Sequence, residues 1–294
     1  MSFEFILYEK DPESHIARVT INRPHKLNAL TQMTYKEIGI AMEDAEDDDD
    51  IKVIILRGAG RSFSTGQDLS EVGFIYGFDS HGKARRPSQR RRMAVDKRWM
   101  ENIAKVFYCN KATIAQVQGH CFGAGLDLYM SCDLSVVAED AEFGHPGQRL
   151  VGPAFDFNMP LYLWKLGPTL ARKILFTGES ISGRDAERWN IVTKVVPPAK
   201  LEEETERLAR KVALMPADGI VMGKAGLRVA ADIMGMGQGF SYGPIAHTWG
   251  TNIRFEKDEH NFFHARAEKG ARNAFHERDE RFEKVDSDKK GGAE

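Results

Sequence analysis

The 294-residue chain has few cysteines, no long apolar run and no excess of charge of either sign. Its three cysteines, Cys109, Cys121 and Cys132, are an odd number without the close spacing of a metal site, which predicts free thiols and a reducing compartment. No segment approaches the ~20 apolar residues that cross a bilayer, and the N-terminus carries acids where a secretory signal is basic. We therefore expect a soluble, cytoplasmic protein without a membrane segment.

Charge is nearly balanced, with 41 basic and 43 acidic side chains, so the net charge predicts no polyanionic partner. One local exception lies within residues 83–98, where only Asp96 opposes the basic side chains of Lys83, Arg85, Arg86, Arg90, Arg91, Arg92, Lys97 and Arg98. Such a run is most often a solvated face. It lacks the interleaved aromatic residues that accompany single-strand recognition, so we do not expect nucleic-acid binding.

Strand-like and helix-like segments alternate in the first two thirds of the chain, which predicts an α/β fold. A hairpin, a helix capped by Thr31 and three buried strands are expected at 3–22, 31–45, 52–57, 112–118 and 132–138. After Pro198 the strand signal ends, and helices are expected at 201–214, 217–234 and 255–281. We accordingly divide the chain into a core of residues 1–200 and a helical region of residues 201–294.

Two glycine-rich segments each follow a buried strand. The first spans residues 58–69 and the second spans residues 119–127, where glycines meet the start of a helix. Glycine lets backbone amides turn outward and lets a ligand come close, and a helix N-terminus offers free N–H groups that can hold a developing oxyanion. Neither cluster is specific by itself, because a tight turn without a ligand explains either one.

Taken in order, the motifs resemble the crotonase (enoyl-CoA hydratase/isomerase) family from about Ala17 to Arg281. The resemblance rests on the segments 22–30, 63–69, 119–128, 132–134, 143–146, 175–178, 185–186 and 191–197. It implies a ββα-spiral core with a C-terminal helical region, a coenzyme A thioester as substrate, and no further cofactor or metal. It also implies a homotrimer or a pair of trimers.

The resemblance also assigns site residues. It implies that the backbone amides of Ser64 and Ala124 form an oxyanion hole that stabilises a thioester enolate. The residues that it places along the coenzyme A channel are Lys26, Leu27, Ala29, Ser62, Ser64, Gly66, Gln67, Asp68, Leu69 and Gly123, with Phe275 on a helix that packs over a coenzyme A site, often a neighbour's. For Asp68, a role in tying the first loop together is the favoured interpretation.

The acid–base residues depart from the family pattern. Hydratases of the family use two glutamates, and the corresponding positions here are Asp127 and Gly147. Asp127 keeps a carboxylate, but Gly147 has no titratable group, so water activation by a glutamate pair is not expected. His145 and Asp156 are nearby substitutes; His145 is otherwise a satisfied loop histidine, and Asp156 is otherwise the N-cap of a helix.

The leading hypothesis is a lyase or isomerase that acts on acyl-CoA through a thioester enolate. One alternative is a crotonase-type enzyme that forms or cleaves C–C bonds with Asp156, favoured by the missing second glutamate. Independently of this, the alternative to a solvated face for the basic run at 83–98 is contact with CoA phosphates or a carboxylated acyl group. Alternatives of another class are an RNA-binding homologue and a catalytically inactive acyl-CoA sensor.

Overall fold

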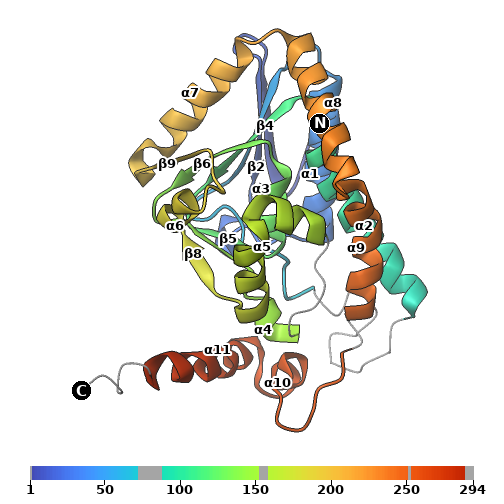
Figure 1. The fold of residues 1–294 in the computed structure, drawn as a ribbon, viewed down its shortest axis with the longest axis vertical. Helices are drawn as coiled ribbons and strands as arrows, with labels where there is room; N and C mark the ends of the chain where they lie inside the picture. The colour runs from blue at the N-terminus through green and yellow to red at the C-terminus, as the bar shows by residue number, and fades with distance from the viewer. Residues whose placement is uncertain (1, 72–87, 152–157, 251–252, 289–294) are drawn as a thin grey trace.

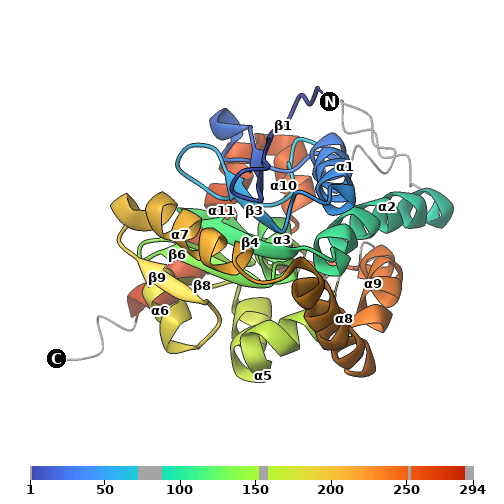
Figure 2. The ribbon, with the colours of Figure 1, turned by 90° about the horizontal axis from the view of Figure 1, so that it is seen from above.

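The computed structural model describes residues 2–71, 88–151, 158–250 and 253–288. Two sheets organise the chain (Figures 1 and 2). A six-stranded sheet has the order β1-β2-β3-β4-β6-β9, and a three-stranded sheet has the order β5-β7-β8. The chain runs between the sheets repeatedly, since β4 is followed by β5 and β6 by β7. This alternation, with helices between the strands, is the spiral core that the sequence predicts.

The predicted hairpin and buried strands are confirmed. β1 (Ile6–Asp11) pairs antiparallel with β2 (Ile16–Ile21), and β2, β3 (Val53–Gly58), β4 (Ala112–Val117), β6 (Leu134–Ala138) and β9 (Lys194–Val196) then pair in parallel. β4 is buried along its whole length, as the apolar composition predicts. The smaller sheet contains β5 (His120–Phe122), β7 (Glu142–Gly144) and β8 (Ser180–Ser182).

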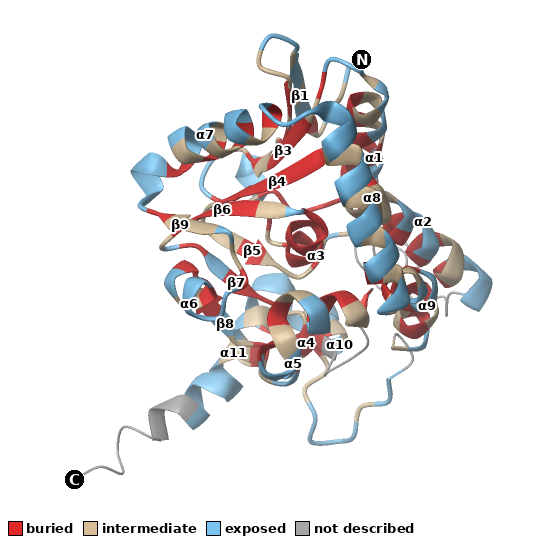
Figure 3. Cartoon of the chain, turned by 45° about the horizontal axis from the view of Figure 1, so that its top comes forward, coloured by how far each residue is buried: buried red, intermediate tan, exposed pale blue. Residues whose placement is uncertain are grey.

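Helices cover both faces of the large sheet. α1 (Gln32–Asp47) begins after the N-cap Thr31, whose hydroxyl accepts a hydrogen bond from the Thr34 amide, so this predicted cap is confirmed. α2 (Gln89–Tyr108) packs on α1, while α7 (Leu201–Ala213) packs on β2, β3, β4 and β6. The short α3 (Ala124–Ser131) is buried at every residue and lies near the centre of the molecule (Figure 3).

The C-terminal helices differ from the prediction. α8 (Ala217–Ile233) matches it, but α9 (Met236–Gly250) was missed, and the single helix predicted at 255–281 is two helices, α10 (Phe262–Lys269) and α11 (Ala271–Asp288). The break falls at Gly270, whose φ of 81° lies outside the helical region. α9 was missed because glycines and Pro244 interrupt its apolar pattern.

Three more α-helices and two 3-10 segments belong to the described chain: α4 (Gln148–Val151), α5 (Met159–Thr177), α6 (Gly183–Arg188), Pro24–Lys26 and Pro198–Lys200. The N-cap of α5 is Asn158, whose side chain accepts from the Leu161 amide at 3.1 Å. The alternative interpretation of Asp156 as this cap is therefore wrong. Within the described ranges, no helix combines the length and the apolar character needed to cross a membrane.

Candidate functional site

The two segments expected to line a coenzyme A channel lie side by side. The amide of Leu30 donates to the Gly66 carbonyl at 2.7 Å, and the Asp68 amide donates to the Leu30 carbonyl at 2.9 Å. The buried side chain of Asn28 adds hydrogen bonds from its amide nitrogen to the carbonyls of Ala59 and Ser62, at 2.8 and 2.7 Å. Residues 25–30 and 58–68 therefore form one hydrogen-bonded unit, although residues 31–57 separate them in the sequence.

A buried ion pair locks this unit. Arg23 Nη2 lies 2.9 Å from Asp68 Oδ2, and the two side chains are only 11% and 8% exposed. The second guanidinium nitrogen, Nη1, donates to the Ala29 carbonyl, and Ser70 donates to Asp68 Oδ1 through its hydroxyl and its amide. Burial would raise the pKa of Asp68, but the hydrogen bonds from Ser70 and Arg23 outweigh it and lower the pKa. Asp68 thus ties the loop together, as the sequence favoured.

The start of α3 presents free backbone amides to the first glycine loop. Helix geometry leaves the N–H groups of Ala124, Gly125 and Leu126 without an intrahelical acceptor, and none of them donates to another described backbone carbonyl. A Cβ on Gly66 would lie 3.2 Å from the Ala124 nitrogen and 2.7 Å from the Phe122 carbonyl oxygen. Gly66 also has a φ of 88°, so only glycine fits where the loop meets α3.

The structure corrects the assignment of Ser64. Its amide donates to the His120 carbonyl at 2.9 Å, because Ser64 and Cys121 form an isolated β-bridge, so it has no N–H left for a substrate. Neighbouring amides of the loop are also occupied: those of Phe63, Thr65, Gly66 and Asp68 donate to Gln118, Leu27, Ser64 Oγ and Leu30. The amide of Gln67 has no hydrogen-bond acceptor among the residues that the structure describes. Gln67 follows Gly66 directly, so its amide is near that of Ala124.

Asp127 is placed where the sequence predicts, one turn into α3. It is 4% exposed, and its amide donates to the Gly123 carbonyl at 3.0 Å. Its charge contributes to raising the pKa of the Cys121 thiol well above its usual value, after the dominant effect of burial. A carboxylate close to the helix N-terminus benefits from the partial positive charge there.

His145 lies beside the same helix start. A Cβ on Gly123 would be 3.7 Å from His145 Nε2, and a Cβ on Gly147 would be 3.2 to 3.3 Å from the ring atoms Cε1 and Nδ1. The imidazole therefore adjoins the space that a side chain at 147 would occupy. The amide nitrogen of Gln148 lies 3.2 Å from His145 Nδ1, and donation from it leaves the proton of a neutral ring on Nε2, the atom nearer Gly123. Sequence reasoning did not single out Gln148.

Two other predicted features are only partly described. Asp156 lies outside the described residues. The part of the basic run from residue 89 onward belongs to α2. There Arg92 is only 6% exposed, while Arg90, Arg91, Lys97 and Arg98 are exposed. The described basic residues therefore do not form one continuous solvated face.

The C-terminal helices close one side of the first loop. Phe262, Ala265 and Ala274 form a small apolar cluster with Leu150, against which Leu69 and Phe275 pack. Arg266 adds a hydrogen bond to the Leu69 carbonyl at 2.9 Å. The predicted element around Phe275 is thus next to the first loop of its own chain.

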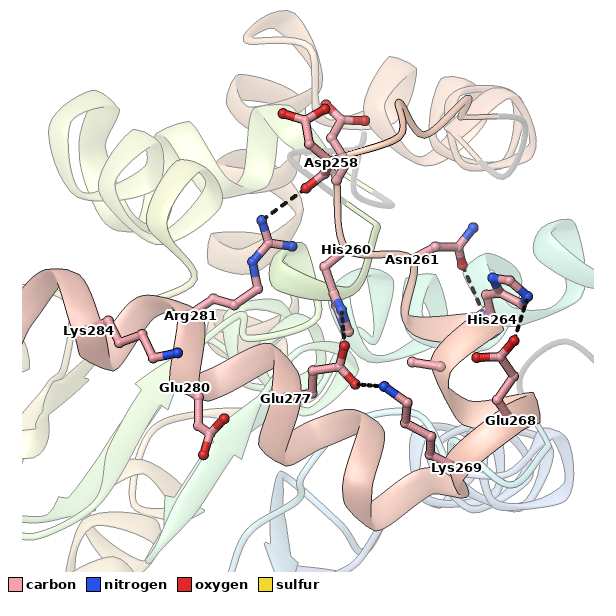
Figure 4. Close-up of a pocket in the computed structure, with 12 residues that line it drawn as sticks. Asp258, His260, Asn261, His264, Glu268, Lys269, Glu277, Glu280, Arg281 and Lys284 are labelled. Atoms are coloured by element: carbon pink, nitrogen blue, oxygen red, sulfur yellow. Dashed lines mark hydrogen bonds and ion pairs between the residues drawn. The ribbon is translucent and has the colours of Figure 1, made fainter.

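A cavity of about 430 Å³ lies between the segment 258–261, α10 and α11 (Figure 4). Its charged side chains pair with one another: Glu277 lies 2.8 Å from Lys269 Nζ and 3.8 Å from His260 Nδ1. Burial lowers the pKa of His260. The lining is too polar for an aliphatic acyl chain, so we do not assign the acyl site to this cavity.

The three thiols are free and buried, and burial raises their pKa values, to about 11 for Cys109 and about 12 for Cys132. They are therefore poor nucleophiles. No group of three or more His, Cys, Asp or Glu side chains suited to a metal ion is found in the described part of the chain.

Known proteins match most of this chain. The family model described as enoyl-CoA hydratase/isomerase matches residues 11–240. The chain belongs to the enoyl-CoA hydratase/isomerase family. The protein EchA13 of Mycobacterium tuberculosis, named as an enoyl-CoA hydratase, is 36% identical over 247 residues, which cover 79% of this chain and 76% of that protein.

Two further relatives extend the comparison. The short-chain-enoyl-CoA hydratase of Clostridium acetobutylicum is 33% identical over 218 residues, covering 72% of this chain and 76% of its own length. The crystal structure of an enoyl-CoA hydratase from Mycobacterium smegmatis superposes with a TM-score of 0.82 at 28% identity and covers 95% of this chain and 94% of that one. The crotonase fold expected from the sequence is confirmed.

Proposed function

We propose that this member of the enoyl-CoA hydratase/isomerase family stabilises a thioester enolate with the amides of Ala124 and Gln67 and transfers protons with Asp127 and His145. The observation that carries the proposal is the pair of free amides at the contact between Gly66 and the start of α3. Two donors aimed at one developing oxyanion supply several kcal/mol, about 3 per donor, of transition-state stabilisation in a dry site.

The proton-transfer groups follow from the same geometry. Asp127 is buried one turn after Ala124, and His145 Nε2 adjoins Gly123. In this proposal Asp127 takes up or returns a proton at the α or β carbon of the acyl group. His145 substitutes for the glutamate that is missing at Gly147 and delivers or receives the second proton. A lyase is the leading reaction class, with isomerase second.

The substrate enters this proposal as a coenzyme A thioester whose pantetheine arm passes between residues 25–30 and 62–69. The test measures binding and turnover separately. Purified protein is titrated with crotonyl-CoA by calorimetry, and hydration and double-bond migration are followed in parallel. Absence of acyl-CoA binding, or an Asp127→Asn variant with unchanged turnover, would refute the proposal.

We also propose that the chain assembles as a homotrimer or hexamer. Support comes from α8, which is mostly exposed in Figure 3 although it carries large apolar side chains. Met222, Val229 and Ile233 follow one face of the helix and are 70%, 61% and 84% exposed. A soluble monomer seldom leaves a contiguous apolar face of this kind uncovered. Light scattering coupled to size-exclusion chromatography measures the molar mass of the assembly. An Ile233→Glu variant is expected to shift this mass toward that of the monomer.

A further inference from the structure

A second cavity, of about 240 Å³, lies at the end of α3 that is remote from Ala124. It is bounded by Cys132 and Asp133 after α3, by the start of β6, by Trp164 and Lys165 of α5, and by residues 190–193. Its most unusual side chain is Lys165, whose Nζ donates to the Cys132 carbonyl at 2.8 Å. None of the acyl-CoA chemistry proposed above uses this lysine.

Lys165 is a largely buried amine whose hydrogen-bond acceptor is an uncharged carbonyl. Asp133, a carboxylate that lines the same cavity, is paired with Lys224 Nζ at 2.6 Å and also accepts from the hydroxyl and amide of Thr113. No carboxylate forms a salt bridge with Lys165 among the described side chains. Burial lowers the pKa of Lys165, so more of it is the neutral amine, which is the nucleophilic form.

Lys224 is a natural comparison in the same neighbourhood. Its Nζ also donates to a backbone carbonyl, that of Lys111 at 2.9 Å, and its side chain is only 11% exposed. Unlike Lys165, it forms an ion pair with the Asp133 carboxylate. A third lysine, Lys173, is on the same helix as Lys165, but it is 47% exposed and pairs with Glu179 at 3.2 Å.

We infer that Lys165 is a site of Nζ-acylation by acyl-CoA thioesters, with the cavity at the end of α3 receiving the acyl group. The neutral amine adds to the thioester carbonyl carbon, and the tetrahedral intermediate expels the coenzyme A sulfur as the C–S bond breaks. The amine loses one proton, which the thiolate takes up. The products are an Nζ-acyl lysine and free coenzyme A, and the remaining N–H can still donate to the Cys132 carbonyl.

The test incubates the full-length native protein with excess acetyl-CoA at pH 8 and locates acetylated lysines by mass spectrometry over time. Cleavage after glutamate places Lys165 and Lys173 in one peptide, from Phe143 to Glu179, which makes their occupancies directly comparable. We expect the Lys165 adduct to accumulate several-fold faster than those at Lys173 and Lys224, because the lowered pKa of Lys165 leaves more of this side chain as the neutral amine.

Two controls distinguish acylation that depends on the folded environment of Lys165 from the general reactivity of lysines with acetyl-CoA. The Lys165→Arg variant keeps a donor for the Cys132 carbonyl and must lose the fast adduct, whereas Lys224→Arg must keep it. In urea the preference for Lys165 must vanish, because burial and the cavity no longer exist. Equal native rates at the three lysines, or a preference that persists in urea, would overturn the inference. Because the adduct is scored and not turnover, the result is independent of the proposed reaction.

Discussion

Removing the Asp68 carboxylate should lower the free energy of unfolding more than removing one member of an exposed ion pair does. In Asp68→Ala, Arg23 remains buried without its partner, since its side chain is 11% exposed and its Nη2 contact at 2.9 Å disappears. Breaking a buried pair by removing one member typically costs about 3–5 kcal/mol. We expect about 3 kcal/mol here, which corresponds to roughly 6 °C in the melting temperature of a chain of this size.

The free energy of unfolding is measured by urea titration, with circular dichroism as the signal that monitors unfolding. A double variant, Arg23→Met with Asp68→Leu, replaces both charges with apolar groups and should recover most of the loss. Glu203→Ala removes the partner of Lys200 from an exposed pair, 59% and 61% exposed, and should leave the urea midpoint unchanged.

The dependence on pH adds a second readout. The pKa of Asp68 is lowered in the folded protein, so its stabilising contribution is present above the unfolded value of about 4 and is lost as the pH falls through the lower folded value. The difference in free energy of unfolding between the wild type and Asp68→Ala should therefore become smaller in strong acid. A loss below about 1 kcal/mol at pH 7 would show that the pair behaves like a surface pair and would refute the reasoning.

Three further changes address catalysis and the glycine loop. Asp127→Asn should lower kcat on the best acyl-CoA by about 10²–10⁴-fold with little change in substrate binding, measured by steady-state kinetics and calorimetry. His145→Gln keeps a polar side chain but removes a proposed proton-transfer group, so it should lower kcat by about 10²–10⁴-fold, measured by steady-state kinetics. Gly66→Ala should destabilise the protein by clearly more than the ~1–2 kcal/mol of a left-handed backbone, because its Cβ would meet the Phe122 carbonyl at 2.7 Å.

Matched variants test these three expectations. Asp140→Asn changes an exposed carboxylate and should leave kcat unchanged. Gly270→Ala has a similar φ of 81° with nothing within 4 Å of the new Cβ, so it isolates the backbone strain from the clash at Gly66. An unchanged kcat in His145→Gln would exclude His145 from proton transfer. Equal losses of stability in Gly66→Ala and Gly270→Ala would exclude the clash at Gly66.

The core of the fold could be predicted from local patterns. Apolar runs without polar interruption marked β3, β4 and β6, and Thr31 marked the start of α1, because burial on both faces and helix capping act through residues that are neighbours in sequence. The C-terminal helices were harder to predict from local patterns. In α9, glycines and a proline obscure the helical period, and the packing of α9 on α2 decides its conformation.

The candidate site divides in the same way. Glycine at 66 and 123, and a carboxylate three residues after Ala124, could be recognised in the sequence because they lie in short motifs. The choice between the Ser64 and Gln67 amides could not, since it depends on which carbonyls from β5 and from residue 30 reach the loop. The ion pair of Arg23 with Asp68 and the contact of His145 with Gly123 likewise join distant segments.

The sequence by itself determined the α/β class, the family resemblance, the glycine elements and the absence of a second glutamate, because each is written in residue types at short spacing. Only the tertiary structure decided which backbone amides are free, what stabilises the buried charges of Arg23 and Asp68, and which groups adjoin the start of α3. The physical reason is that a free N–H is defined by the hydrogen bonds around it. Those bonds form between chain segments that only folding brings together.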